Sequence, residues 1–193
     1  MSTDSVAAAL SEHGALVDRV QREMAGQIHA LARAVLETLQ GGGKLLFCGN
    51  GGSAADAQHL AAEYMIRFGE NREGLPALAL TTDTSVLTAG ASDLGFEHVY
   101  ERQVQALARP GDLLLIHSTS GESESLIRAA EAARRAGART AALLAKGGGR
   151  LRERVDLALV VPTDSTARAQ EMHITIGHIV CEFVDRSVAK RGR

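Results

Sequence analysis

Short apolar runs and helical patterns alternate along most of this chain. The runs are rich in Leu, Val, Ile and Ala, and they lie near residues 44–48, 76–81, 112–117, 139–145 and 156–161. Segments with apolar residues at helical spacing separate them, which is the pattern of a parallel sheet covered by helices on both faces. The sequence therefore predicts an α/β fold, a doubly wound, five-stranded parallel sheet with flanking helices.

Two helical patterns precede the first strand. They run from about Ser5 to Met24 and from Gln27 to Gln40, and the second keeps apolar residues on one face, namely Ile28, Leu31, Val35, Leu36 and Leu39. The 193 residues are 45% hydrophobic and 23% charged, which is enough to bury one core without disulfides. We expect a single domain over residues 1–193, with N-terminal helices in 1–40 and the α/β core in 41–190.

The first expected strand leads into a glycine turn, formed by Asn50, Gly51 and Gly52, and a helix begins directly after it. A helix start directs unpaired backbone N–H groups at the turn, and glycines let an anion come close, so the turn is suited to bind a phosphate. His59 and Glu63 lie four residues apart on one face of this helix, where they can be two metal ligands or a ligand and an acid/base group. Taken alone, this spacing also fits a solvated surface pair.

A second loop of this type follows the strand near 112–117. This serine loop, residues 118–123, carries hydroxyl groups on Ser118, Thr119, Ser120 and Ser123. One hydroxyl suffices to cap a helix, so four within six residues favour anion binding over simple capping.

The two strand-turn-helix units align with each other at a constant offset. Leu45 falls over Leu113 at the start of the alignment, and Glu63 falls over Glu131 at its end. We interpret this as repetition of one strand-turn-helix unit rather than as a solenoid repeat. Both loops should emerge beyond the carboxyl ends of the strands, near the switch point of the sheet, and face one pocket.

The last helical pattern, from Thr166 to about Val188, carries polar residues inside an apolar stretch. Gln170 and His178 are eight residues apart, which is about 80° around the helix and roughly 12 Å along it. The two side chains could therefore meet at one centre only if each extended along the helix toward the other. A lone histidine in such a stretch is more often a satisfied core residue, so the helix by itself leaves the role of His178 open.

Composition excludes several classes of function. A net charge of −2 and 3% aromatic residues give neither a basic field nor a stacking platform, so no nucleic-acid partner is expected. No apolar run approaches the roughly 20 residues of a membrane span and no signal-peptide pattern is found, so we expect a cytoplasmic protein. Cys48 and Cys181 do not suggest a disulfide framework. For Cys48 we favour a packing role over a chemical one. For His117 we favour packing over a response to the charge of a bound phosphate.

Four motifs together carry a resemblance to a known family. They are residues 48–59, residues 82–89 with 93–97, residues 118–121, and Gln170-Glu171-Met172-His173 with His178. In this combination the chain resembles the phosphoheptose isomerases, the sedoheptulose 7-phosphate isomerase branch of the sugar-isomerase (SIS) fold, over residues 15–188. The resemblance implies a flavodoxin-like SIS domain and homotetramers whose active sites lie at subunit interfaces.

The resemblance also implies roles for the matching positions. The serine loop is similar to the family's phosphate grip, and the positions expected to contact the rest of the substrate are Asn50, Gly51, Gly52, Glu63, Ser92, Asp93 and Gln170. The positions that bind one zinc ion per subunit in metal-containing members are His59, Glu63, Gln170 and His178. Glu63 and His178 also match the acid/base pair, and the two roles conflict because a metal ligand is less free to transfer a proton.

The implied reaction converts sedoheptulose 7-phosphate to D-glycero-D-manno-heptose 7-phosphate. Moving a proton between C1 and C2 passes through an enediol, which needs a base, an acid and a group that stabilises the developing oxyanion. We expect His178 to be the base and Glu63 the acid. Zinc would stabilise the oxyanion as a Lewis acid.

Three departures from the family pattern leave room for alternatives. Glu122 brings a carboxylate into the serine loop, Ser92 replaces a common asparagine, and Gly90 replaces a larger residue. The last two leave open an isomerase for another sugar phosphate. A different class, non-catalytic SIS tetramers that bind a protein such as the bacterial replication initiator, loses the glutamate at the position of Glu63. The presence of Glu63 and His178 favours an enzyme.

Overall fold

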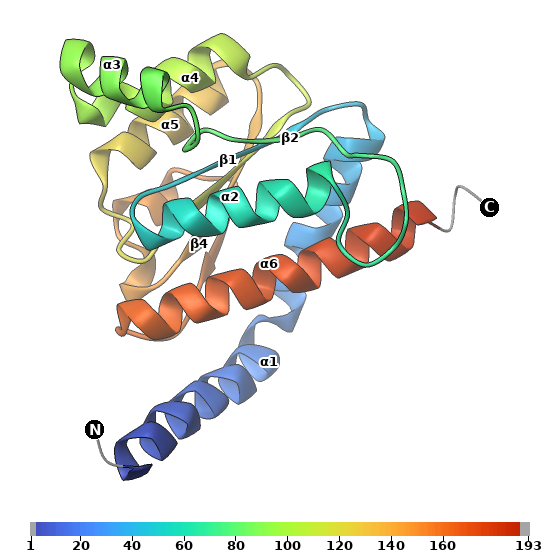
Figure 1. Cartoon of the computed structure of the whole chain (residues 1–193), viewed down its shortest axis with the longest axis vertical. Coiled ribbons are helices and arrows are strands. Elements are labelled where there is room, and N and C mark those ends of the chain that lie inside the picture. Colours follow the sequence, from blue (N-terminus) through green and yellow to red (C-terminus); the bar gives the residue numbers. More distant parts are fainter. Residues whose placement is uncertain (1–2, 190–193) are drawn as a thin grey trace.

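A five-stranded parallel sheet forms the centre of the molecule, whose computed structural model describes residues 3–189 (Figure 1). The strands are β1 (Leu45–Gly49), β2 (Ala77–Ala79), β3 (Leu113–Ser118), β4 (Arg139–Leu144) and β5 (Leu157–Val160). They pair in the order β2-β1-β3-β4-β5, and every pair is parallel. The predicted doubly wound sheet is confirmed. The expected end of the core, residue 190, lies outside the described residues.

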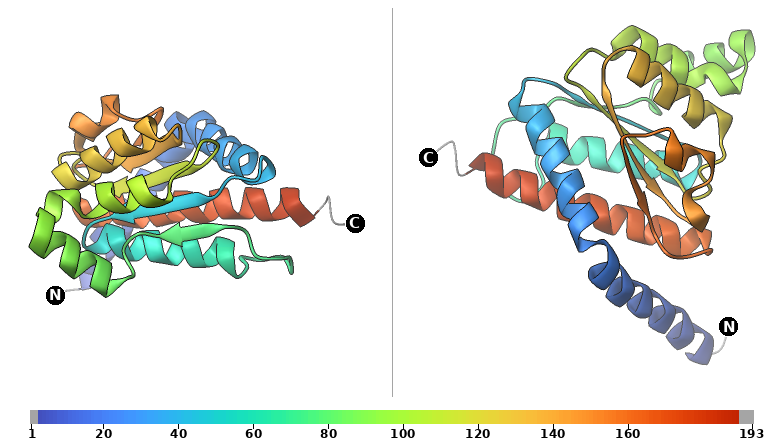
Figure 2. Two further views of the ribbon diagram at one scale, coloured as in Figure 1. Left: turned by 90° about the horizontal axis from the view of Figure 1, so that it is seen from above. Right: turned by 180° about the vertical axis from the view of Figure 1, so that it is seen from behind.

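Helices cover both faces of the sheet, as the layers in Figure 2 show. One face is covered by α1 (Thr3–Gln40), α2 (Gly52–Met65) and α6 (Thr166–Ala189), and the other by α3 (Thr84–Leu94), α4 (Val99–Leu107) and α5 (Glu124–Arg135). Three short 3-10 helices complete the described elements, η1 (Phe96–His98), η2 (Lys146–Gly148) and η3 (Arg150–Glu153). Because both faces are buried, the central strands are continuous apolar runs.

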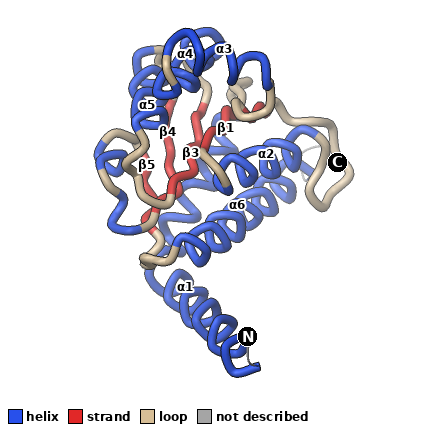
Figure 3. Tube along the Cα trace, turned by 60° about the vertical axis from the view of Figure 1, so that its left-hand side comes forward, coloured by secondary structure: helices blue, strands red, loops and turns tan. Residues whose placement is uncertain are grey.

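The N-terminal segment is one helix, where the sequence predicts two. α1 continues from Thr3 to Gln40, and its ribbon bends partway along (Figure 2). Gly26 lies at the predicted break, but a glycine inside a helix costs only about 1 kcal/mol relative to alanine. Met24 and Ile28 on either side of it are buried in the core, and this packing keeps the helix continuous. The N-terminal part of α1 projects away from the sheet (Figure 3).

The strand order places the switch point between β1 and β3. The chain passes from β1 outward to β2 and then returns to the other side of β1 as β3. In this pair Leu45 lies opposite Leu113 and Gly49 lies opposite His117. Residues that are aligned between the two strand-turn-helix units in the sequence are therefore also paired across β1 and β3 in the sheet. It brings the glycine turn and the serine loop out of the sheet side by side, as predicted.

Candidate active site

Hydrogen bonds tie the glycine turn and the strand before it to the helices on the other face of the sheet. The Asn50 amide donates to the Ser125 hydroxyl at 3.1 Å, and this hydroxyl lies just beyond the serine loop, on α5. The Tyr100 hydroxyl donates to the Gly49 carbonyl oxygen at 2.6 Å. Among the described residues, the buried Asn50 Oδ1 atom has no hydrogen-bond partner. Buried polar atoms in native proteins are normally paired, so this oxygen is available to a ligand.

The serine loop is folded by two of its own hydroxyl groups. Ser118 Oγ accepts a hydrogen bond from the Gly121 N–H at 3.0 Å, and Ser120 Oγ accepts one from the Glu122 N–H at 3.2 Å. Ser123 stands at the N-cap of α5, yet its side chain makes no capping bond within the described part of the chain. Capping therefore does not account for this group of hydroxyls.

The start of α2 is open to an anion in the same way. Gly51, the N-cap residue, has a φ of 59°, and no side chain caps the helix within residues 3–189. The N–H groups of Ser53 and Ala54 donate to the carbonyl oxygens of Asn50 and Gly51, so this helix end offers an anion its dipole and the N–H groups of Gly51 and Gly52. A Cβ atom added at Gly52 would lie 2.6 Å from Nε2 of Gln170, so the absence of a side chain at Gly52 lets α6 come this close.

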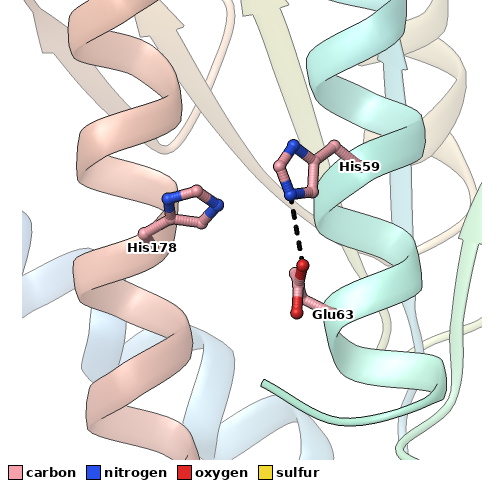
Figure 4. Close-up of side chains that lie close together, drawn as sticks. All are labelled: His59, Glu63 and His178. Carbon is pink, nitrogen blue, oxygen red and sulfur yellow. Dashed lines mark hydrogen bonds and ion pairs between the residues drawn. The ribbon is translucent and has the colours of Figure 1, made fainter. Parts of the chain in front are cut away.

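Three of the four predicted metal ligands meet where α2 passes α6 (Figure 4). This His-Glu-His cluster consists of His59 and Glu63 on α2 and His178 on α6, and its ligand atoms all lie within 4.8 Å of one another. His59 Nε2 and Glu63 Oε1 are 3.1 Å apart, and the rings of His59 and His178 meet edge to face with centroids 5.0 Å apart. His59 and Glu63 on α2 thus face a third side chain, His178 on α6, and do not form an isolated solvated pair.

The electrostatics of the cluster keep His178 neutral. Burial lowers the pKa of His178, the neighbouring His59 lowers it further, and Glu63 opposes both effects. Nε2 of His178 is buried and has no hydrogen-bond partner among the described residues. A neutral imidazole whose nitrogen is not engaged elsewhere can accept a proton or bind a metal ion. Imidazole and carboxylate donors at this separation fit a zinc ion.

The fourth predicted ligand, Gln170, lies next to the start of α2. α2 and α6 run side by side in the same direction (Figure 1), and the amide of Gln170 lies against Gly52. Gln170 precedes His178 by eight residues, and Gly52 precedes His59 by seven. The side chain therefore stands before the cluster, between the glycine turn and the metal-ligand positions.

Two predicted substrate residues lie apart from the cluster within one chain. Ser92 and Asp93 belong to α3, which is on the opposite face of the sheet from α2 and α6 (Figure 1). Both are exposed, and α3 has no buried residue at all among its eleven. The fold of a single chain therefore does not bring Ser92 and Asp93 to the His-Glu-His cluster.

Two residues beside the loops belong to the core. His117 is fully buried beside His173, with ring centroids 6.3 Å apart, and its pKa is lowered to about 3 by burial and by the charge of His173. It therefore stays uncharged beneath the serine loop. Cys48 is buried, and burial raises the pKa of its thiol, so it remains protonated. These positions agree with packing roles.

Sequence reasoning missed Phe68. It lies between α2 and β2, and its ring packs against His178 with centroids 5.5 Å apart. This segment has no regular apolar spacing, so nothing in the sequence signals the contact.

Glu122 of the serine loop is held by Arg150. The Glu122 carboxylate accepts hydrogen bonds from the Arg150 backbone N–H at 3.0 Å and from its Nε at 2.9 Å. The guanidinium group also donates to the Glu122 carbonyl oxygen at 2.9 Å. These hydrogen bonds lower the pKa of Glu122, so the carboxylate is charged and is neutralised by Arg150.

Comparisons with known proteins agree with this geometry. The SIS domain family matches residues 10–145. The phosphoheptose isomerase of Roseiflexus sp. strain RS-1 is 55% identical over 170 residues, which are 88% of this chain and 86% of that protein. The phosphoheptose isomerase of Akkermansia muciniphila is 53% identical over 165 residues, 86% of this chain and 87% of that one.

Two solved structures share the whole fold. A phosphoheptose isomerase from Neisseria gonorrhoeae superposes with a TM-score of 0.89 at 42% identity, covering 95% of this chain and 98% of the other. One from Francisella tularensis gives a TM-score of 0.93 at 34% identity, covering 96% and 100%. With such identity over nearly its full length, the chain belongs to the SIS domain family and, within it, to the phosphoheptose isomerases.

Proposed function

We propose that this enzyme interconverts sedoheptulose 7-phosphate and D-glycero-D-manno-heptose 7-phosphate through an enediol. The observation that carries the proposal is the His-Glu-His cluster, which α6 completes beside the helix that starts at the glycine turn. An aldose–ketose isomerisation needs a base, an acid and stabilisation of an oxyanion at adjacent carbons. A neutral imidazole and a carboxylate within 4.8 Å of each other can serve two adjacent atoms of one substrate.

The phosphate group binds in the serine loop. Ser118, Thr119, Ser120 and Ser123 supply hydroxyl donors there, and the capping position of Ser123 leaves its hydroxyl without a helix bond. The sugar chain then extends toward the glycine turn. Backbone N–H groups at Gly51 and Gly52 would donate to its oxygens, and the unpaired Oδ1 atom of Asn50 would accept from one of its hydroxyl groups.

His178 takes the proton from the sugar and Glu63 serves the carbonyl oxygen. Burial lowers the pKa of His178, so the base form prevails at neutral pH. Glu63 lies on the facing helix, where His59 fixes its carboxylate by a contact of 3.1 Å. In this assignment the base comes from α6 and the acid from α2.

One zinc ion per subunit completes the proposed site. His59, Glu63 and His178 would hold it, and Gln170, whose amide lies beside Gly52 in this structure, is proposed as the fourth ligand. Bound zinc supplies Lewis-acid polarisation of the substrate carbonyl. A ligand set with an amide oxygen is a weaker one than an all-histidine set, so the bound metal should be removable by chelation.

Four copies assemble so that active sites lie between subunits. α3 offers Ser92 and Asp93 on a surface without buried residues, and these side chains are available to the site of a neighbouring copy. A groove of about 400 Å³ between α1 and α6 is lined almost entirely by apolar groups, among them Val17, Val20, Ile28, Ile176, Ile179 and Phe183. A second copy of α1 and α6 would cover it, because apolar patches of this kind mark interfaces.

The enzyme acts in the cytoplasm, where phosphorylated sugars are made and kept. Within residues 3–189, every helix is too short or too polar to cross a membrane.

Chelation and metal return test the proposed function. We expect purified protein to convert sedoheptulose 7-phosphate to the aldose, to lose this activity after treatment with a chelator, and to regain it with zinc but not with magnesium. Turnover that chelation leaves unchanged would remove zinc from the proposal and leave direct acid/base chemistry by Glu63 and His178. Absence of turnover in every metal state would overturn the assigned reaction.

Removing Arg150 tests the phosphate site. In an Arg150→Ala variant the Glu122 carboxylate loses its neutralising partner beside the serine loop, and repulsion should raise KM for the sugar phosphate several-fold with little change in kcat. The effect should shrink at high salt, because both side chains are about half exposed. A Glu122→Gln, Arg150→Ala double variant should regain the parent KM. If KM in the single variant equals that of the parent, Glu122 has no influence on phosphate binding.

A further inference from the structure

A buried ion pair lies outside every motif that the sequence offers. Arg72 is in the segment between α2 and β2, and Asp185 is in the last turns of α6. Nε of Arg72 donates to Oδ1 of Asp185, and the two side chains are only 5% and 2% exposed. A buried pair of charges is costly unless each group is fully hydrogen-bonded.

Each member of this pair is saturated by backbone groups. Oδ2 of Asp185 accepts hydrogen bonds from the N–H groups of Gly69 at 2.8 Å and Glu70 at 2.7 Å. Burial alone would raise the pKa of Asp185, but these two bonds and Arg72 outweigh it and hold the pKa below its ordinary value. The carboxylate is therefore charged, and it anchors the segment that follows α2 to the end of α6. Figure 1 shows this segment passing around that end of α6.

Arg72 holds the last turn of α2 at the same time. Nη2 donates to the Glu63 carbonyl oxygen at 2.9 Å, and Nη1 donates to the Tyr64 carbonyl oxygen at 2.9 Å. These are carbonyls at the C-terminal end of a helix, which have no partner in the helix itself. Glu63 is the residue whose side chain enters the His-Glu-His cluster. The guanidinium group thus fixes the backbone from which that carboxylate projects.

The ion pair is also connected to His178, on the other side of the cluster. Gly69, which donates to Asp185, directly follows Phe68, and the Phe68 ring packs on His178 with centroids 5.5 Å apart. Asp185 itself lies seven residues after His178, which is about two turns further along the same face of α6. The ion pair is therefore connected to Glu63 through Arg72 and to His178 through Asp185 and Phe68.

We infer that Arg72 and Asp185 are positioning residues, which set the separation of α2 and α6 and hence the geometry of the His-Glu-His cluster. The inference rests on the proposed function of that cluster as the metal and acid/base site. Neither side chain touches the substrate or the metal in this account. A pair that only stabilised the fold would lower stability when broken but would leave metal affinity and catalysis unchanged in the protein that remains folded.

The chain contains a matched control for this distinction. Asp112, 3% exposed, is bound by Lys44 Nζ and accepts backbone N–H bonds from Lys44 at 2.9 Å and Arg109 at 2.8 Å. It thus resembles Asp185 in burial and in its partners, but it precedes β3 at the amino end of the sheet. Its partners Lys44 and Arg109 lie outside α2, α6 and the segment between α2 and β2, so Asp112→Asn reports the cost of breaking a buried pair that does not hold the helices of the cluster.

The experiment compares Asp185→Asn with Asp112→Asn. For each folded variant we would measure the thermal midpoint, zinc affinity by competition with a chromophoric chelator, the absorption spectrum of bound cobalt, kcat and KM. We expect both to lower the midpoint, but only Asp185→Asn to weaken zinc binding by about tenfold or more, the usual effect of removing support behind a ligand. It should also change the cobalt spectrum and lower kcat more than it raises KM. Asp112→Asn should keep the parent's cobalt spectrum, and its zinc affinity, kcat and KM should stay within twofold of the parent values.

Two outcomes would overturn the inference. One is a folded Asp185→Asn protein with parental zinc affinity, cobalt spectrum and kcat, and the other is equal losses in Asp112→Asn. If Asp185→Asn does not fold, Arg72→Lys decides, because lysine keeps the charge opposite Asp185 but cannot hold the Glu63 and Tyr64 carbonyls together, so the same site losses are expected. A parent protein that binds cobalt but turns over no sugar phosphate would count against the proposed reaction alone, since metal affinity and spectrum would still test the positioning role.

Discussion

Replacing Glu63 with glutamine will lower turnover of sedoheptulose 7-phosphate by a factor of about 10² to 10⁴, the range that a positioned acid or base contributes. Glutamine keeps the size and shape of the side chain but cannot exchange a proton with the substrate oxygen. It also removes one carboxylate oxygen from the group that Glu63 forms with His59 and His178. The loss should appear mainly in kcat, because the phosphate group is bound elsewhere, in the serine loop.

A matched glutamate provides the control. Glu131 occupies the position of Glu63 in the second strand-turn-helix unit, but on α5 it pairs with Arg154. Glu131→Gln should retain parental kcat. Steady-state kinetics on both variants, with circular dichroism to verify folding, makes the comparison. A folded Glu63→Gln enzyme that works at the rate of Glu131→Gln would remove Glu63 from the chemistry.

Replacing Gly121 with alanine will damage both stability and phosphate binding. Gly121 has a φ of 68°, and a Cβ atom there would lie 1.9 Å from the Gly148 carbonyl oxygen, which is backbone and cannot rotate away. The serine loop or the loop around Gly148 must therefore move. Gly121 also donates to Ser118 Oγ, so this movement would displace the hydroxyl groups that are proposed to hold the phosphate.

Gly111 separates the two causes of that damage. Its φ of 92° is also left-handed, but a Cβ atom there would meet nothing within 4 Å. Gly111→Ala should lower the free energy of unfolding by about 1 to 2 kcal/mol from backbone strain alone. Gly121→Ala should lose a further 1 to 3 kcal/mol or so from overpacking, and it should raise KM where Gly111→Ala does not. Denaturant unfolding and kinetics measure both quantities, and equal effects of the two variants would contradict the steric account.

The sheet was predictable because its strands are buried on both faces. Runs such as Leu113 to His117 have no alternation that could be mistaken for a surface strand, and turn residues bound them. The alignment of the two strand-turn-helix units even contained the register of β1 on β3. The helix boundary near Gly26 failed because the packing of Met24 and Ile28, which the sequence alone does not locate, outweighs the weak helix propensity of glycine.

The cluster was predictable where the spacing on a helix brings residues together, and unpredictable in the irregular segment between α2 and β2. His59 and Glu63 share a helix face by spacing alone, and His178 joins them because α6 packs beside α2. Phe68 and Arg72 come from an irregular segment whose path is set by its tertiary contacts. No periodicity records such contacts, so these two residues emerge only from the folded chain.

Several contacts of the fold join segments that are far apart in the sequence, and this affects how the chain folds. β1 pairs with β3 although α2, β2, α3 and α4 lie between them along the chain, and a hydrogen bond between His13 and Glu171 joins α1 to α6. Non-local contacts require large loops to close before they stabilise anything, which slows folding and leaves apolar strands exposed meanwhile. His178 reaches the cluster only when α6 docks on α2. A chain in which α6 has not yet docked therefore lacks the complete His-Glu-His cluster, and the proposed metal and acid/base site forms only when the two ends of the fold have come together.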